Sequence, residues 1–86
     1  MIDSKENPVE WSQLMSELKG VHEHLGDLIK EMGSKGSIDI EGYSIDIAHI
    51  YAYLSRAWNS REFKGEMSKS QWEEFRSFPS NLELIA

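Results

Sequence analysis

The sequence predicts an all-α fold, an antiparallel hairpin of two long helices covered by a short third helix. Apolar residues from Trp11 to Met32 recur at alternating spacings of three and four, the period of an amphipathic helix. A second stripe with the same period runs from Tyr43 to Ala57. The stretch between them, residues 33–37, is short and rich in Gly and Ser, so the two helices must fold back on each other.

The first helix is expected over about residues 8–32. Residues 1–7 are polar and are expected to fray, and Asn7 followed by Pro8 is a favoured helix start. Gly33 offers the left-handed conformation that commonly ends a helix. All 86 residues should form one small domain.

Two glycines interrupt this helix on the solvent side of its apolar stripe. Gly20 and Gly26 each weaken a helix by about 1 kcal/mol relative to alanine. They therefore indicate either a bend or a close contact with another helix.

The second helix is expected over about residues 39–63, with Gly65 just beyond it. Residues 38–47 also alternate apolar and polar side chains around Glu41 and Gly42, which is typical of a β-hairpin. Asp39 as a cap, with the helical stripe extending back to Ile40, favours the helix.

Three strips of this helix have different characters. The predicted core face consists of Tyr43, Ile47, Ile50, Leu54 and Ala57. A strip of small side chains would let a second backbone approach closely and is a candidate partner surface: Ala48, Ala52, Ser55 and Asn59. The remaining polar strip is Asp46, His49, Tyr53 and Arg56.

A third, short helix is expected over about residues 69–77, because Ser68 and Gln71 form a capping-box pattern. Pro79 then begins a tail, residues 79–86, that ends in large apolar residues. Three aromatic residues on this helix or directly after it are expected to be partly exposed and available to a partner, namely Trp72, Phe75 and Phe78.

The composition narrows the classes of function. Nine Lys and Arg against fifteen Asp and Glu give a net charge of −6, which disfavours nucleic-acid binding. Without cysteine there is no disulfide or thiolate site, and no apolar run approaches the roughly 18 residues that would suggest a membrane span. We therefore expect a cytoplasmic protein with no membrane partner.

One candidate constellation would make the chain a metal-binding helical bundle. In an antiparallel hairpin His22 and His49 would lie at the same level, with Asp46 nearby, and imidazole with carboxylate suits a divalent metal ion. His22 and His24 are two residues apart and cannot chelate one ion together. The alternative of structural histidines without any cofactor is favoured.

An acidic stripe, Glu10, Glu17 and Glu31, follows one edge of the first helix; its positions are spaced by seven, and His24 occupies the one between Glu17 and Glu31. The favoured alternative is a solvated flank that keeps a small protein soluble. If the stripe is functional, it would attract a basic protein, because charge at such edge positions selects the partner. Enzymatic templates such as a phosphate-binding glycine loop are absent from the sequence. The favoured function is a non-enzymatic protein–protein interaction or accessory module that acts as a homodimer, with the small-residue strip at its interface.

Overall fold

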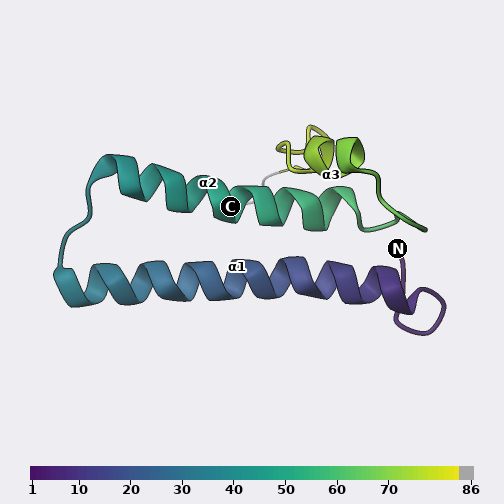
Figure 1. Ribbon diagram of the computed structural model, residues 1–86, viewed down its shortest axis with the longest axis horizontal. Coiled ribbons are helices and arrows are strands. Elements are labelled where there is room, and N and C mark those ends of the chain that lie inside the picture. Colours follow the sequence, from purple (N-terminus) through teal and green to yellow (C-terminus); the bar gives the residue numbers. More distant parts are fainter. Residues whose placement is uncertain (84–86) are drawn as a thin grey trace.

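The computed structural model describes residues 1–83, which contain three α-helices and no strand. α1 (Pro8–Lys35) and α2 (Ile40–Asn59) form an antiparallel hairpin, and α3 (Lys69–Phe75) lies against α2 at the end where the chain begins (Figure 1). The molecule measures 45 × 29 × 25 Å, and its long axis follows α1. The predicted all-α hairpin with a short third helix is therefore confirmed.

α1 ends three residues later than expected. Gly33 stays helical, and Gly36 takes the left-handed conformation (φ 68°) and donates its N–H to the carbonyl oxygen of Met32 at 2.8 Å. A pair between Lys35 Nζ and Glu31 Oε1 at 3.0 Å supports the additional turn. At the other end Pro8 occupies the first turn as predicted, although the Asn7 side chain makes no cap bond.

α2 begins as a helix at Ile40, so the β-hairpin alternative for residues 38–47 is wrong. The Asp39 carboxylate accepts the N–H of Gly42 at 2.6 Å and caps the helix. The helix ends at Asn59, four residues short of the predicted end, because two consecutive turns follow. In these turns Arg61 N–H donates to Trp58 and Phe63 N–H donates to Ser60.

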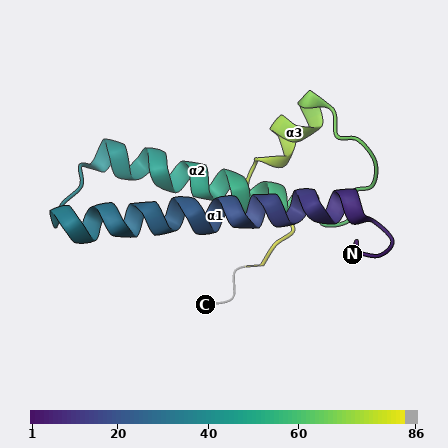
Figure 2. The same cartoon turned by 60° about the horizontal axis from the view of Figure 1, so that its bottom comes forward.

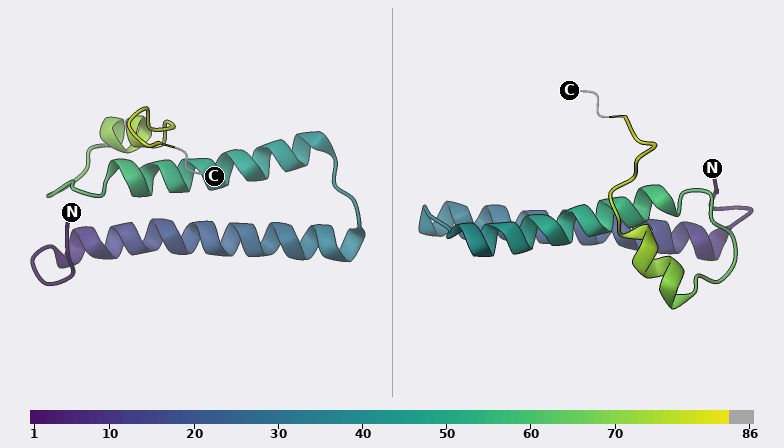
Figure 3. Two further views of the ribbon diagram at one scale, coloured as in Figure 1. Left: turned by 180° about the vertical axis from the view of Figure 1, so that it is seen from behind. Right: turned by 90° about the horizontal axis from the view of Figure 1, so that it is seen from above.

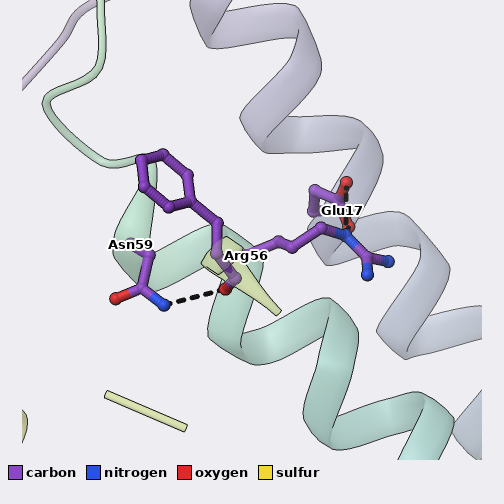
Figure 4. Close-up of polar contacts among 4 residues, drawn as sticks. Glu17, Arg56 and Asn59 are labelled. Carbon is purple, nitrogen blue, oxygen red and sulfur yellow. Dashed lines mark hydrogen bonds and ion pairs between the residues drawn. The ribbon is translucent and has the colours of Figure 1, made fainter. Parts of the chain in front are cut away.

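α3 starts where its capping box predicts. Ser68 and Gln71 exchange both side-chain-to-backbone hydrogen bonds. The helix ends at Phe75, two residues early. The Asn59 side-chain amide donates to the carbonyl oxygen of Phe75 at 2.8 Å (Figure 4). It also donates to that of Ser77 at 3.0 Å, and the two bonds hold the chain in a turn against α2.

Residues 1–7 are not frayed. The Ile2 side chain is 4% exposed and packs with Leu14 and Ala57, and its N–H donates to the carbonyl oxygen of Arg61 at 3.1 Å. The Asp3 side chain accepts two backbone N–H groups and forms the turn that leads into α1. The N-terminal segment therefore closes one end of the hairpin.

The chain after α3 crosses over the outer side of α2. Viewed along the layer of the hairpin, α3 lies to one side and the following segment emerges on the other (Figure 3). Figure 2 shows the same crossing from a second angle. The hairpin therefore has two lateral faces with different coverings.

Candidate functional site

The contact between α1 and α2 uses a different face of α2 from the one predicted. Ile50 and Ala57 are buried as expected, but Tyr43 and Leu54 are 38% and 43% exposed. Tyr53 and Arg56, from the predicted polar strip, instead lie against α1. α2 is thus rotated about its axis relative to the prediction.

Two features of α1 explain this rotation. Gly20 leaves room for the Tyr53 ring, since a Cβ atom added at Gly20 would lie 2.5 Å from that ring. Glu17 accepts hydrogen bonds from Arg56 Nε with both carboxylate oxygens, at 3.0 and 3.1 Å (Figure 4). The contact between α1 and α2 therefore pairs a glycine with an aromatic ring and a carboxylate with a guanidinium group.

Arg56 is the most enclosed charged residue of residues 1–83, with 7% of its surface exposed. Its guanidinium carbon lies 4.9 Å from the centre of the Tyr53 ring and 4.5 Å from that of Trp72. These contacts, together with Glu17, fix the orientation of the guanidinium group.

The predicted metal ligands do not come together. His49 faces His24, with ring centres 6.1 Å apart, whereas His22 is exposed on another side of α1. Within residues 1–83 no three His, Asp or Glu side chains are arranged to hold a metal ion. The arrangement gives no support to the metal alternative.

The small-residue strip is partly used within the chain itself. Ser55 is 3% exposed, and Asn59 is bonded to the segment after α3. Ala52 is half-buried, and only Ala48 remains open. The strip predicted as a homodimer interface is therefore covered at one end.

Of the three aromatic residues predicted to bind a partner, one packs inside the chain and two remain exposed. Phe75 packs edge-on against Phe63 at 5.6 Å, inside the chain. Trp72 and Phe78 remain 44% and 54% exposed, on opposite sides of the crossing segment. They belong to two separate surfaces.

The first surface, here called the apolar face, covers one lateral side of the hairpin. On α1 it follows a 3–4 spacing through Met15, Leu18, His22, Leu25, Ile29 and Met32, and α2 contributes Tyr43, Tyr51 and Leu54. All of these side chains are exposed to solvent. Near Met1 the face is hollowed by a groove of about 420 Å³, to which Leu18, Tyr51, Phe78 and Leu82 contribute. The sequence already indicates such a face, because the apolar stripe of α1 is too wide to be covered by a single neighbouring helix.

The second surface, here called the cleft, lies on the opposite lateral side, between α1, α2 and α3. It has a volume of about 490 Å³, and its walls include Glu10, Glu17, Arg56, Phe63, Glu66 and Trp72. Glu10 accepts the N–H of Gly65 at 2.8 Å, and this bond holds the pKa of the Glu10 carboxyl below its ordinary value. Two members of the predicted acidic stripe, Glu10 and Glu17, thus reach the cleft, while Glu31 pairs with Lys35.

The sequence did not indicate that Glu66 and the loop after α2 would join these residues, because that loop is placed by long-range contacts.

None of the helices within residues 1–83 is both long and apolar enough to cross a membrane. No protein-family model, curated protein or solved structure matches the chain.

Proposed function

We propose that the chain is a non-enzymatic protein–protein interaction module that acts as a homodimer, with the apolar face as the interface between the two copies. The observation that carries the proposal is the exposed apolar stripe along α1 and α2. Its 3–4 spacing from Met15 to Met32 is the pattern with which two helices pack along a shared seam.

The solvent-accessible area of the chain is larger than expected for a monomer of this mass, which supports a dimer interface. The chain presents 6664 Å² to solvent, whereas a folded monomer of 9.9 kDa is expected to present about 5,200 Å². The excess of about 1,500 Å² exceeds the roughly 800 Å² that each partner buries in a standard interface. Within residues 1–83, α3 and the segment after it leave the part of the apolar face from His22 to Met32 exposed.

The internal core also favours a second copy. Only six apolar residues within 1–83 are buried, and no large side chain among them is fully enclosed. Packing two apolar faces about a two-fold axis would create a four-helix core. The stripe on α1 contains no acidic residue, so the net charge of −6 does not place like charges in this seam.

A matched pair of isoleucines tests the proposal. Ile29 is 63% exposed within the apolar face, and Ile45 is 57% exposed on α2, turned away from it. We expect native mass spectrometry and light scattering of the wild-type chain to give a dimer near twice 9.9 kDa. Ile29→Asp should yield monomer, because a charge in a buried seam is costly, whereas Ile45→Asp should stay dimeric.

Two results would count against the proposal. One is a wild-type chain that remains a monomer, and the other is a dimer that both substitutions leave intact. Circular dichroism of both variants is the control for folding. In a monomer the two substitutions concern similarly exposed residues and should affect helicity alike.

A further inference from the structure

The two halves of the apolar face have complementary shapes. The half near Met1 contains the groove of about 420 Å³, whose lining includes the buried Leu14 and, from the segment after α3, Phe78 and Leu82. The half near the loop between α1 and α2, here called the loop half, carries Ile29, which at 63% is the most exposed apolar side chain of the stripe on α1. A hollow and a projecting side chain therefore lie in opposite halves of one face.

The stripe on α1 reads the same in both directions. From Met15 to Met32 the steps between its successive residues are three, four, three, four and three. Two copies of this stripe that run antiparallel therefore align residue for residue, so that Met15 lies level with Met32 of the partner subunit and Leu18 lies level with the partner's Ile29. In a two-fold interface each such contact occurs twice, with the roles of the two copies exchanged.

This symmetry brings the groove and Ile29 together. Leu18 lines the groove, and Ile29 lies 11 residues further along α1, a distance of about 16 Å. An antiparallel two-fold dimer therefore sets the groove of each copy against the partner's Ile29. If the two copies instead pack with like ends together, groove faces groove, and the side chains that line the two hollows lose contacts with a partner.

We propose that the groove is the docking site for the loop half of a second copy, and that the two copies pack antiparallel with the two-fold axis level with His22 and Leu25. The inference rests on the proposed homodimer and adds which part of one copy meets which part of the other. The surface of the groove is almost entirely apolar, and so are Ile29 and Met32, which enter it from the second copy. Full overlap of the two stripes also buries the whole length of the face, which makes the largest use of the area that a monomer leaves exposed.

Charged residues at the edge of the face distinguish the two arrangements. Within one chain Gly20 lies against Tyr53, which fixes the levels of α1 and α2 relative to each other. With like ends together α1 packs on the partner's α2, and Lys30 lies within about one turn of the partner's Glu41. In the antiparallel dimer α1 packs on the partner's α1, and Lys30 lies within about one turn of the partner's Lys19. All three side chains are exposed, so these pairs contribute too little to decide the arrangement, but they report it.

The chain has no cysteine, so introduced thiols can report the arrangement. Ser12 and Ser34 are exposed on α1 and lie 22 residues apart, about 33 Å and beyond the reach of a bismaleimide that spans about 15 Å. In the antiparallel dimer Ser12 lies within one residue of the level of the partner's Ser34, on helices about 10 Å apart. The double variant Ser12→Cys/Ser34→Cys should therefore be cross-linked to a covalent dimer by this reagent.

Three controls accompany the double variant. Ser12→Cys alone and Ser34→Cys alone should not be cross-linked, because in the antiparallel dimer the two copies of each residue lie more than about 30 Å apart along the helix axis. Adding Ile29→Asp to the double variant should abolish the cross-link, because a monomer cannot supply the second thiol within reach. Circular dichroism shows whether each variant keeps its helices.

A second measurement uses no cysteine. In analytical ultracentrifugation at low salt Lys30→Glu should strengthen the dimer about two- to fivefold, because the new carboxylate lies near the partner's Lys19. With like ends together the same substitution would weaken the dimer, because the new carboxylate would lie near the partner's Glu41.

The outcomes separate this inference from the proposed homodimer. A dimer whose double variant is not cross-linked, whose single variants are cross-linked, or whose affinity falls in Lys30→Glu would overturn the antiparallel arrangement and leave the homodimer standing. A wild-type monomer would overturn both. A monomer that carries one apolar molecule in native mass spectra would also assign the groove to that ligand instead of a second copy.

Discussion

Gly20 and Gly26 lie six residues apart on α1, and the same substitution should act on them in opposite directions. A Cβ atom at Gly20 would lie 2.5 Å from the Tyr53 ring, whereas one at Gly26 meets nothing within 4 Å. The ring cannot easily swing aside, because the centre of the His24 ring lies 5.1 Å from its centre and the guanidinium carbon of Arg56 lies 4.9 Å from it.

Two terms set the magnitude. Replacing glycine by alanine inside a helix gains about 1 kcal/mol. Overpacking a well-filled contact costs about 1 to 3 kcal/mol. We therefore expect Gly26→Ala to stabilise the chain by about 1 kcal/mol and Gly20→Ala to destabilise it by a similar amount, so that the two variants differ by about 2 kcal/mol.

The assay is thermal unfolding followed by circular dichroism, at protein concentrations where dilution no longer changes Tm. For a domain of this size 1 kcal/mol corresponds to a shift in Tm of roughly 4 to 8 °C, so the two signs are easily separated. Gly20→Ala should become stabilising in a Tyr53→Leu background. Equal stabilisation by both alanines would show that α1 and α2 do not approach each other at Tyr53.

Two further predictions concern carboxylates. Glu17→Ala should lower the free energy of unfolding in urea by about 2 kcal/mol, because it leaves the buried Arg56 guanidinium unpaired. Glu31→Ala removes only the exposed pair with Lys35 and should lower it by less than about 0.5 kcal/mol. Similar losses for the two variants would contradict the burial of Arg56. The lowered pKa of Glu10 means that its ionised form stabilises the fold above its ordinary pKa and that this contribution disappears as the pH falls through the folded-state value. Glu10→Gln should therefore lower Tm at neutral pH and leave it close to that of the wild type at about pH 2.5, and a deficit that persists in acid would show that the charge is not responsible.

Features that depend on neighbouring residues could be predicted from the sequence. The caps at Asp39 and Ser68 are satisfied within three residues of their own position, and both helix starts follow from them. The predicted end of the first helix at Gly33 was wrong because the sequence offers more than one local stop. Several positions after Met32 can end the helix, and the pair between Glu31 and Lys35 favours the later one, Gly36.

Features that depend on distant residues could not be predicted. The face that α2 turns towards α1 is decided by the fit of Tyr53 to Gly20 and of Arg56 to Glu17, and no local pattern reports such a match. The burial of Ile2 depends on the carbonyl group of Arg61, 59 residues away. The cleft requires Glu66, from the loop before α3, to meet Glu10 of α1.

The ordered N-terminal segment has a consequence for how the molecule opens. Ile2, α3 and the segment after it all reinforce the same end of the hairpin, whereas within residues 1–83 the end near Gly36 is held only by α1 and α2 (Figure 1). We therefore expect local unfolding to begin at the loop and to spread inward, so that amide protons near Ile40 should exchange before those near Ala57. Ile29, Met32 and Tyr43 lie in this less stable half, so pairing of two apolar faces would restrain the part of the chain that is freest to open.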